Sequence, residues 1–482
     1  MRLLVDTNIV IAHEDDDPDA PHVNARSVGA LVELSRALGF ELLTSHGTRS
    51  DFARAAEPYR AARMRALRKY YAVLEPVPTS PIVRKHFPSS LTPQNRADLE
   101  VLSSFATGAA TALVTEDRAM RSRARDAGLT GVFSLDEALE WLRGLRDPTL
   151  INAAAAHMTH AYQIDRSAQI FRSLNADYPD FDTWWMTKVV PERRPVIVLG
   201  EADAPNGIAV MKEEEDVLGI AGRVLKICTF KIGDELGGSR RGELLLRAVV
   251  DYATQRSYEV TYLTVLPHHD QLIGWLGRFG FRRRAGITDG GEIVMVKRFV
   301  PEDTAPALGP LAHHVEYGPR SLIVERVFLI PIQASFHSLL LPDGDDQQSL
   351  LENMACGNAI RKAYLCHSNN RQLRPGDTLV FLRTGRGPAE ATAVGVVEDI
   401  LVSDRPDLIA AFVGGRTVYS YGEIQRQCHK EVLTVLFRFD RRIDPVWSRD
   451  VLVNAGVMVS TPMSITSVPE AGTTWVRSQL TR

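Results

Sequence analysis

The sequence RLLVDTN at residues 2–8 decides how the N-terminal part of the chain folds. A short apolar run is followed at once by Asp6, and a second short apolar run, ALV, stands at residues 112–114. Helical patterns of apolar residues lie between the two runs, at residues 28–38 and 97–106. This alternation predicts a parallel α/β layer over residues 2–145. Asp6 then ends a strand, at the edge where open parallel sheets bind their ligands.

Two further aspartates are predicted to reach the same edge. Asp98 stands where a helix is expected to begin, in NRADLEVLSSFA, and Asp117 follows the strand ALVT. Because the ends of parallel elements meet at one edge of a sheet, these carboxylates are expected to converge with Asp6. Clustered carboxylates repel one another unless a hard cation such as Mg²⁺ or Mn²⁺ neutralises them. Such an ion activates water and stabilises charge on phosphate, which is nuclease chemistry.

Four pieces of this region, LVDTN, SDFAR, RADLEVL and VTEDR, resemble the acidic motifs of the PIN domain in order and spacing. The resemblance implies a metal-dependent endoribonuclease, with Asp6, Asp98 and Asp117 as metal ligands. It also matches Asp51 to the remaining acidic position, where the family usually has Glu, and Glu116 is the alternative there. Asn8 and Thr115 match its polar helpers.

The bland alternative is that these aspartates only cap turns and helices, which is the usual role of an isolated Asp at such places. Arginine and lysine residues near the acidic motifs favour an RNA substrate, because positive charge binds phosphates. A solvated helix face also carries such runs. The basic residues are Arg54, Arg60, Arg63, Arg65, Arg68, Lys69, Arg118, Arg121, Arg123 and Arg125.

Bulk composition limits the other possibilities. The chain has 482 residues, 45% of them hydrophobic, and a formal net charge of -3. The net charge of the whole chain therefore does not indicate a nucleic-acid partner. Its four cysteines lack CxxC spacing and are expected to be free thiols in a reducing compartment. No signal peptide or membrane-spanning run is evident, so a cytoplasmic protein is expected. The length favours several domains, and composition changes place them at 1–147, 150–300 and 320–482.

The middle region is predicted to be a mixed α/β domain. Strands are expected at 196–199, 207–211, 225–232, 259–265 and 292–296, with helices near 242–256 and 269–278. Between the third strand and the first helix, a glycine-rich loop could hold a pyrophosphate on backbone amides. The residues assigned to this cofactor site are Cys228, Gly237, Gly238, Arg240, Arg241 and Gly242.

This loop and the later LIGWLGRFGF resemble the acetyl-coenzyme A motif and closing GF turn of the GNAT acetyltransferases, over residues 155–300. The resemblance implies acetyl-CoA as a cofactor. Glu243 and Leu244 depart from the phosphate-loop pattern, and Leu276 stands where the family often has a general-acid Tyr. His268, His269 or the acidic run 213–216 are the remaining candidates for a base. The alternative is a GNAT fold used only for packing or partner binding.

Residues 301–320 are rich in Pro, Ala and Gly and are predicted to form a linker. Beyond it, residues 357–387 are predicted to form a helix, a turn and a strand hairpin, within a small β-barrel. RPGDTLVFL and AVGVVEDI resemble PUA-like or ASCH-type domains, which implies RNA binding. Charge and aromatic groups suited to single-stranded RNA stand at Arg361, Lys362, Tyr364, His367 and Arg371. The alternative is an exposed helix face with a core Tyr.

The order of the three resemblances is similar to that of bacterial toxin-antitoxin and defence proteins. It implies a regulated endoribonuclease whose partners are RNA, a cognate antitoxin and a second copy of the chain, without a membrane. One rival is an acetyltransferase acting on an RNA- or protein-linked amine. The other is a non-enzymatic RNA-binding regulator or antitoxin.

Overall fold

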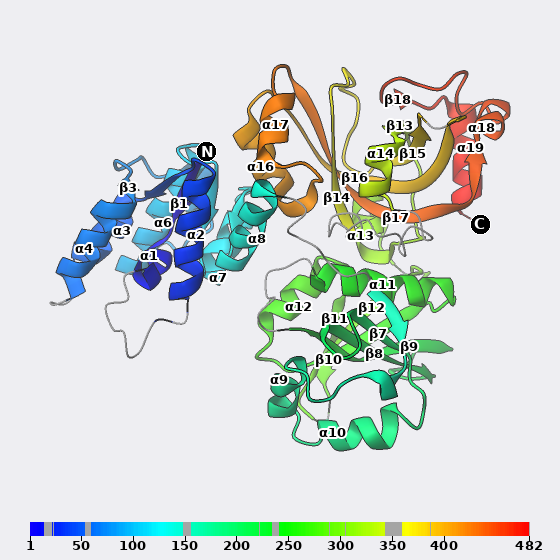
Figure 1. Cartoon of the computed structure of the whole chain (residues 1–482), viewed down its shortest axis with the longest axis horizontal. Coiled ribbons are helices and arrows are strands. Elements are labelled where there is room, and N and C mark those ends of the chain that lie inside the picture. Colours follow the sequence, from blue (N-terminus) through cyan, green and yellow to red (C-terminus); the bar gives the residue numbers. More distant parts are fainter. Residues whose placement is uncertain are drawn as a thin grey trace. The chain divides into compact units, whose positions relative to one another are not determined.

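The computed structural model describes residues 1–13, 22, 24–53, 59–147, 156–220, 222–233, 241–288, 290–303, 305–342, 359–385 and 387–481, with backbone only at 59–63, 66, 271 and 287. The chain forms two compact units, and each is described by itself (Figure 1). The first comprises Met1–Ile151 and Ser403–Glu431, and the second comprises Asn152–Val402 and Val432–Arg482. Among the described helices, none combines the length and the apolar character needed to cross a membrane.

The first unit is built on a five-stranded parallel sheet in the order β3-β2-β1-β4-β5. Its strands are β1 (Arg2–Val5), β2 (Glu41–Thr44), β3 (Ala72–Val73), β4 (Ala112–Val114) and β5 (Val132–Phe133). The predicted parallel α/β layer is therefore confirmed. The strand order reverses between β1 and β4, so the crevice at their carboxyl ends is the topological switch point of the sheet.

Helices cover the sheet of the first unit. They are α1 (Thr7–His13), α2 (Ala25–Ala37), α3 (His46–Ala53), α4 (Tyr59–Tyr70), α5 (Pro81–Arg84), α6 (Pro93–Ala106), α7 (Arg118–Asp126) and α8 (Leu135–Arg146). On one face, α5, α6 and α7 pack in a single apolar cluster with Leu4, Leu43 and Leu113. Elsewhere in the unit α2 packs against α8. Both helices predicted here are present and begin a few residues earlier than their apolar periodicity indicates.

A segment from late in the chain completes the first unit. Residues 403–431, with α16 (Pro406–Val413), η6 (Gly414–Arg416) and α17 (Tyr421–Gln427), belong to it, although the sequence places them in a domain of residues 320–482. Trp141 of α8 is 1% exposed and donates from Nε1 to the carbonyl oxygen of Ala410 at 2.9 Å. Phe40 packs edge-on against Tyr421, with ring centroids 5.0 Å apart. The segment thus covers apolar side chains that residues 1–147 leave open.

The second unit contains a seven-stranded sheet in the order β11-β12-β10-β9-β8-β7-β6. The strands are β6 (Ala156–Thr159), β7 (Val196–Gly200), β8 (Pro205–Glu215), β9 (Arg223–Ile232), β10 (Val260–Val265), β11 (Arg282–Ile287) and β12 (Ile293–Arg298). Only β9 and β10 pair in parallel among the described strands of this sheet. The five predicted strands are present. The two edge strands, β6 and β11, were not predicted because one is short and the other begins with three arginines.

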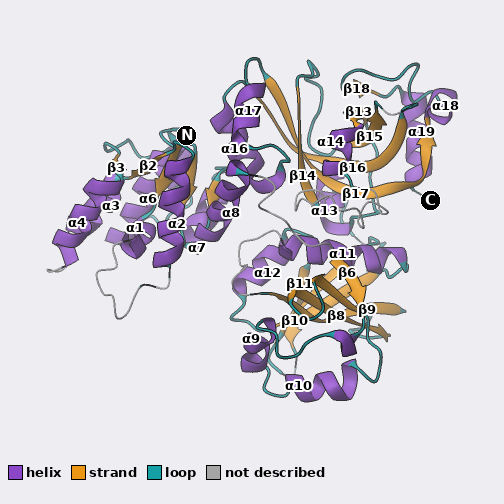
Figure 2. Cartoon of the chain, in the orientation of Figure 1, coloured by secondary structure: helices purple, strands orange, loops and turns teal. Residues whose placement is uncertain are grey.

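Helices pack on this sheet, and one more helix follows its last strand in the sequence (Figure 2). They are η2 (Ala161–Gln163), α9 (Ile170–Asp177), α10 (Phe181–Trp184), η3 (Trp185–Val189), α11 (Arg241–Gln255), α12 (Asp270–Gly277) and α13 (Pro310–Tyr317). Phe171 and Trp185 pack with apolar residues of β7 and β8. The linker predicted at 301–320 is wrong in part, because it contains α13. Gly280 permits the close packing of α13, since it has φ +83° and a Cβ there would lie 2.2 Å from the Val315 oxygen.

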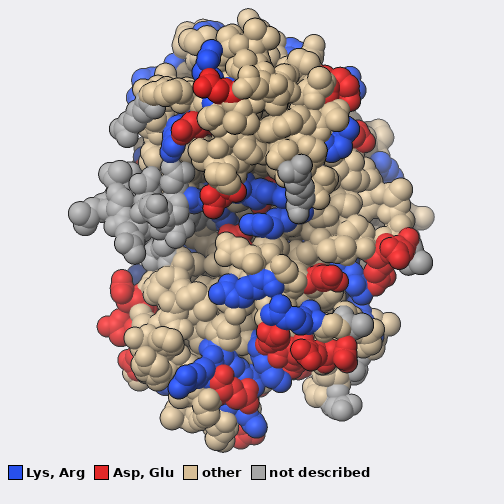
Figure 3. Space-filling model, turned by 90° about the vertical axis from the view of Figure 1, so that its right-hand side faces the viewer, with Lys and Arg blue, Asp and Glu red and all other residues tan. Residues whose placement is uncertain are grey.

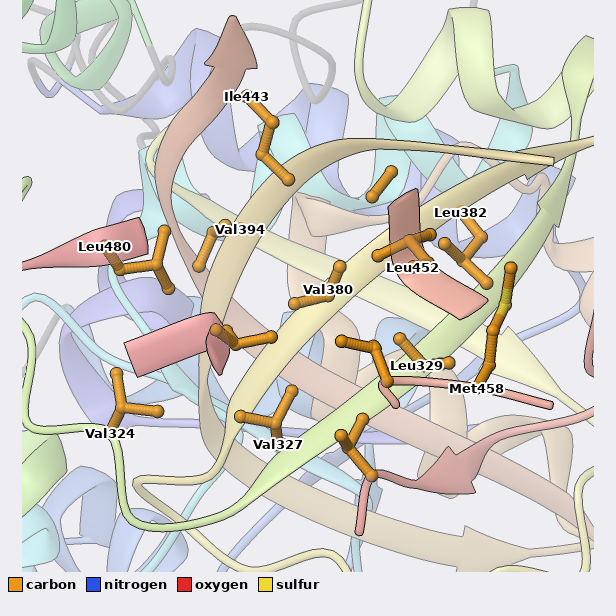
Figure 4. Packing of buried hydrophobic residues seen from close by; sticks show 14 residues of the cluster. Val324, Val327, Leu329, Val380, Leu382, Val394, Ile443, Leu452, Met458 and Leu480 are labelled. Atoms are coloured by element: carbon orange, nitrogen blue, oxygen red, sulfur yellow. The ribbon is translucent and has the colours of Figure 1, made fainter. Parts of the chain in front are cut away.

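The second unit also contains a six-stranded sheet, curved like half a barrel, in the order β14-β17-β16-β15-β13-β18. Its strands are β13 (Val327–Gln333), β14 (Arg361–Cys366), β15 (Thr378–Thr384), β16 (Glu390–Ser403), β17 (Val432–Ser448) and β18 (Thr466–Ser467), and its helices are α14 (Ala334–Leu340), α18 (Arg449–Asn454) and α19 (Glu470–Leu480). Leu329, Val380 and Leu452 lie in its core (Figure 4). The sheet as described has two edges, so the described strands form an open sheet where a small β-barrel was predicted.

The helix predicted at the start of residues 357–387 is wrong. Residues Arg361–Cys366 form β14, which pairs antiparallel with β17 through partners such as Tyr364 and Val435. Ala363 and Leu365 are buried while Tyr364 and Cys366 are only half-buried, which is the two-residue period of a strand. Pairing with a long buried neighbour therefore outweighs local helical propensity here.

Two predictions from composition can be followed into the structure. Cys228, Cys366 and Cys428 are free thiols, as expected, and Cys356 lies outside the described residues. On the face drawn in Figure 3, Lys and Arg are interspersed with Asp and Glu. The mixture of charges on that face is consistent with the small net charge of the chain.

Candidate metal centre

Four aspartates from four different elements meet at the carboxyl edge of the parallel sheet. Asp6 directly follows β1 and Asp117 follows β4, the neighbouring strand, in which Val114 pairs with Val5. Asp51 lies on α3, which follows β2, and Asp98 lies on α6. These elements put the predicted carboxylates at the switch point of the sheet, where open α/β folds bind ligands.

Asp6 is buried, with 5% of its surface exposed, and its two carboxylate oxygens are fixed by hydrogen bonds. Oδ1 accepts from the backbone nitrogen of Thr7 at 2.7 Å. Oδ2 accepts from Asn8 Nδ2 and from Thr115 Oγ1, each at 2.8 Å. Asn8 and Thr115 are thus the polar companions that the sequence suggested. Their hydrogen bonds fix the orientation of the Asp6 carboxylate.

Asp98 does not begin its helix, contrary to the prediction. Thr92 caps α6 by accepting from the Asn95 backbone nitrogen at 3.1 Å, and Pro93 occupies the first turn, so the helix starts five residues before Asp98. Asp98 therefore projects from the second turn. Its Oδ2 lies 3.3 Å from Arg123 Nη1, an ion pair that sequence reasoning did not find.

Close packing of α3 on α6 brings Asp51 into the group. Gly47 stands at this contact, where a Cβ would lie 3.2 Å from the Ala97 carbonyl oxygen and 3.3 Å from Glu100. A larger residue would hold the two helices apart. Because Asp51 lies one helical turn after Gly47, this close approach directs α3, and Asp51 with it, toward Asp98.

The four aspartates of the group act on one another electrostatically. Burial, together with the charges of Asp117 and Asp51, raises the pKa of Asp6 to about 6, against the hydrogen bonds from Thr115 and Thr7. Burial and the charges of Asp117, Asp6 and Asp51 raise the pKa of Asp98 to about 7, and Arg123 opposes them. Asp6 and Asp98 are therefore harder to ionise, because they are buried and because other carboxylates are near.

Asp51, rather than Glu116, is the fourth member of this acidic cluster of Asp6, Asp51, Asp98 and Asp117. Asp51 contributes to the raised pKa values of both Asp6 and Asp98. Glu116 turns away, because its Oε1 accepts from the backbone nitrogen of Leu135 at the start of α8, at 2.6 Å. Asp117 is also the N-cap of α7, because its Oδ1 accepts from the Met120 backbone nitrogen at 2.9 Å. Asp117 therefore caps a helix and also belongs to the acidic cluster.

The donor set fits a hard divalent cation. The described donors at this edge are carboxylate, amide and hydroxyl oxygens, which Mg²⁺ and Mn²⁺ prefer. Neutralising several mutually repelling carboxylates is what such an ion supplies. Among all the described residues, Asp177, His268 and His269 are the one group of three His, Cys, Asp or Glu residues whose ligand atoms all lie within 4.8 Å of one another. The carboxylates of the acidic cluster are spaced more widely than that, so a cation would draw them together.

Basic residues near the cluster fall into two sets. Arg65, Arg68 and Lys69 on α4 are exposed. Arg121 and Arg123 are used internally, because Arg121 donates to the Thr115 carbonyl oxygen and Arg123 pairs with Asp98. Arg118 and Arg125 are exposed on α7. The side chains of three residues predicted to bind RNA, Arg54, Arg60 and Arg63, lie outside the described residues.

The candidate cofactor site of the second unit is described only in part. Gly237, Gly238 and Arg240 lie outside the described residues, whereas Arg241 and Gly242 form the start of α11. β9 and β10 pair from Val224↔Val260 to Ile227↔Leu263, and the described pairing ends there although both strands continue. On the other side of β9, a register shift leaves Cys228 out of the pairing with β8.

Cys228 sits at this bulge as a neutral thiol. Burial raises its pKa, and Arg194 Nη1 lies 3.5 Å from its Sγ. Glu243, which departs from the phosphate-loop pattern, is buried and accepts from the Arg361 backbone nitrogen at 2.6 Å. The Glu243 carboxylate therefore joins the start of α11 to the start of β14.

The residues predicted to bind RNA in β14 have internal contacts. Lys362 is fully buried, and its Nζ donates to the Leu340 carbonyl oxygen at 2.6 Å. Arg361 Nε donates to Glu398 at 2.8 Å, and the Tyr364 hydroxyl donates to the Pro331 carbonyl oxygen at 3.0 Å. The alternative prediction, an exposed helix face, is therefore wrong. These residues lie on a strand, and their polar side chains contact neighbouring elements.

No protein-family model and no curated protein matches the sequence. Three solved structures illustrate what parts of the chain are similar to. The PaiA N-acetyltransferase of Thermoplasma acidophilum in complex with coenzyme A is 12% identical over 30% of this chain and 99% of its own, with a TM-score of 0.24. A GNAT family acetyltransferase of Elizabethkingia anophelis with acetyl-CoA bound is 13% identical over 30% of this chain and 98% of its own, with a TM-score of 0.22.

The third, a mutant ZmASCH protein of Zymomonas mobilis, is 12% identical over 34% of this chain and 98% of its own, with a TM-score of 0.25. Each of the three likenesses covers about a third of the chain or less. Neither a PIN domain nor a toxin-antitoxin context is supported by these comparisons.

Proposed function

We propose that the first unit hydrolyses phosphodiester bonds in RNA with Mg²⁺ or Mn²⁺ held by Asp6, Asp98 and Asp117. One observation carries the proposal: carboxylates from four separate elements lie at the switch point of a parallel sheet, where burial, with repulsion between the carboxylates added to it, raises the pKa of Asp6 and of Asp98. Such an arrangement is unfavourable for folding unless a bound cation offsets it. The motif resemblance to PIN nucleases is consistent with this function.

The bound ion would supply a Lewis acid and an activated water molecule near neutral pH. The chain's own residues would prepare the site for it. Asn8 and Thr115 hold the Asp6 carboxylate in one orientation, and Arg123 holds that of Asp98. Asp51 adds a fourth negative charge that completes the ion's surroundings or orients water. The exposed Arg65, Arg68 and Lys69 of α4 would bind backbone phosphates.

The test is RNA cleavage by the full chain with Mn²⁺ or Mg²⁺ and with Asp6→Asn. Removing one ligand charge is expected to lower the cleavage rate by at least about 100-fold, since the ion contributes several kcal/mol to such reactions. Asp126→Asn is the matched control, because Asp126 is an exposed aspartate on α7. RNA binding without cleavage under either cation would instead support a non-enzymatic RNA-binding regulator.

A second candidate function, acetyl-CoA-dependent acetyl transfer to an RNA- or protein-linked amine, concerns the second unit. It is favoured by the parallel strands β9 and β10, whose described pairing stops at Ile227 and Leu263 before either strand ends. Backbone amides of β9 beyond that point could bind an extended ligand as a strand would. The start of α11, at Arg241 and Gly242, lies where a helix N-terminus would attract phosphate.

Acetyl-CoA binding by the full chain tests this second function. Gly242→Glu is expected to abolish binding, because it places a negative side chain beside Trp275 at the start of α11. Gly290→Glu is the control, since Gly290 is exposed and its Cβ would meet only Thr288, at 3.7 Å. Equal binding by wild type and Gly242→Glu would rule out the proposed phosphate position.

A further inference from the structure

We infer that Asp177, His268 and His269 bind one Zn²⁺ ion on the second unit. One atom of each side chain can act as a ligand, and these three atoms all lie within 4.8 Å of one another. The group is separate from the acidic cluster, which lies in the first unit. It does not depend on phosphodiester hydrolysis or on acetyl transfer.

The end of one helix and the turn before another bring the three residues together. Asp177 is the last residue of α9, and the histidines stand in the turn between β10 and α12. The turn is fixed by the His269 backbone nitrogen, which donates to the Leu266 carbonyl oxygen at 3.0 Å. The two imidazole rings lie side by side, with centroids 4.2 Å apart. Both rings are thereby held near Asp177 although they come from consecutive residues.

The spacing agrees with zinc coordination. Zn–N bonds of about 2.0–2.1 Å and Zn–O bonds of about 2.0–2.2 Å put the ligand atoms of a tetrahedral site about 3.3–3.5 Å apart. His269 Nε2 lies 3.5 Å from Asp177 Oδ2. Small rotations of partly exposed side chains would bring the third ligand atom within the same range. The distance between His269 Nε2 and Asp177 Oδ2 is therefore already that expected for two ligands of one tetrahedral ion.

The donor types select the metal. Two imidazoles with one carboxylate suit Zn²⁺, whereas Mg²⁺ prefers oxygen ligands throughout. Three protein ligands leave the fourth tetrahedral position for water, which is the pattern of open zinc sites. The partial exposure of the three residues gives the ion a path from solvent. A plain surface ion pair between His269 and Asp177 would not need His268 beside it.

The test is Zn²⁺ binding to the full chain, measured by calorimetric titration after chelation, with Mg²⁺ in excess to occupy the acidic cluster. The double variant His268→Ala, His269→Ala is expected to weaken binding by more than about 100-fold, because loss even of a residue that only hydrogen-bonds to a metal ligand costs about 10–100-fold. Asp177→Asn is expected to weaken it as well. His157→Ala is the control, since His157 is an exposed histidine of the same unit.

Co²⁺ provides an independent measurement. Co²⁺ bound by the wild type is expected to show the strong visible absorption of tetrahedral coordination, and the histidine double variant is expected to lose it. The same spectrum should persist in Asp6→Asn, Asp98→Asn, which disrupts the acidic cluster and leaves this group intact. Unchanged zinc affinity in the histidine double variant, or no binding to the wild type at millimolar Zn²⁺, would overturn the inference.

Discussion

At the scale of single residues, burial and like charge in the acidic cluster work together against the hydrogen bonds to Asp6 and the ion pair of Asp98. Asp6 is buried among hydrogen-bond donors that favour its ionised form, yet burial and neighbouring carboxylates outweigh them and raise its pKa. Asp98 has one compensating cation, Arg123, and its pKa is raised further. Each aspartate could be predicted from its motif. Arg123 could not, because an arginine two residues from Arg121 and from Arg125 on α7 is typical of a solvated helix face.

The raised pKa values predict how stability changes with pH. Asp6 and Asp98 bind protons more tightly in the folded chain than in the unfolded chain, so their protonation favours folding. In chelator, the stability of the first unit should therefore fall as pH rises from about 4 to about 7, and change little above that through these groups. Calorimetry of the wild type against Asp6→Asn, Asp98→Asn measures this.

The double variant should lack that part of the pH dependence and should be the more stable of the two at neutral pH. Adding Mn²⁺ at neutral pH should stabilise the wild type and leave the double variant unchanged. A wild type whose stability rises over the same pH range relative to the double variant would contradict the assignment of the raised pKa values.

Arg123 should set the pH dependence of RNA cleavage through Asp98. Its guanidinium lowers the pKa of Asp98, so Arg123→Leu should raise that pKa further and move the acidic limb of the pH–rate profile upward by about one unit. The profile is measured at limiting Mn²⁺, where protons and the cation compete for Asp98, with Arg125→Leu as the control on the same helix. Arg125 is exposed, so its loss should leave the profile in place.

At the scale of elements, the contact between α3 and α6 positions Asp51. Gly47→Val should hold the helices apart, cost about 1–3 kcal/mol of stability by overpacking, and weaken Mn²⁺ binding by displacing Asp51. Gly29→Val on α2 is the control, because a Cβ there has nothing within 4 Å. Calorimetric titration with Mn²⁺ compares the two variants. Equal Mn²⁺ affinity in both would show that Asp51 does not contribute to the site.

Elements with strong periodicity could be predicted from sequence, whereas those decided by distant partners could not. The strands β1, β4 and β7 to β10 are apolar runs bounded by polar residues, and the helices α6 and α11 carry regular apolar faces. β14 was mistaken for a helix because its partner, β17, lies far along the chain. α13 was missed because its cap, Gly309, and Pro310 look like linker residues.

At the scale of the whole molecule, residues 403–431 connect the stability of the first unit to a late part of the chain. Tyr421→Ala should lower the stability of the first unit by about 3 kcal/mol, because it uncovers Phe40. Leu452→Ala is the control, since Leu452 lies in the core of the curved sheet and should lower the stability of the second unit. Hydrogen exchange of β1 and of β15 amides reports the two units separately.

Composition changes predict three consecutive domains, whereas contacts divide the chain into two units, and the excursion of residues 403–431 could not be predicted. β16 and β17 are neighbours in one sheet, and nothing in their composition indicates that the chain leaves the sheet between them. Only contacts such as Trp141 with Ala410 place the intervening helices in the first unit. In the same way, the grouping of Asp177 with His268 and His269 depends on tertiary structure rather than on spacing in the sequence.

The same excursion has a consequence for biosynthesis. A ribosome that adds about 5–20 residues per second releases residues 1–151 well before residues 403–431. Throughout that interval the indole of Trp141 and the ring of Phe40 lack their covering partners. A nascent or truncated polypeptide that ends before residue 403 therefore carries an unfinished first unit. Translation must therefore pass residue 431 before this unit can mature.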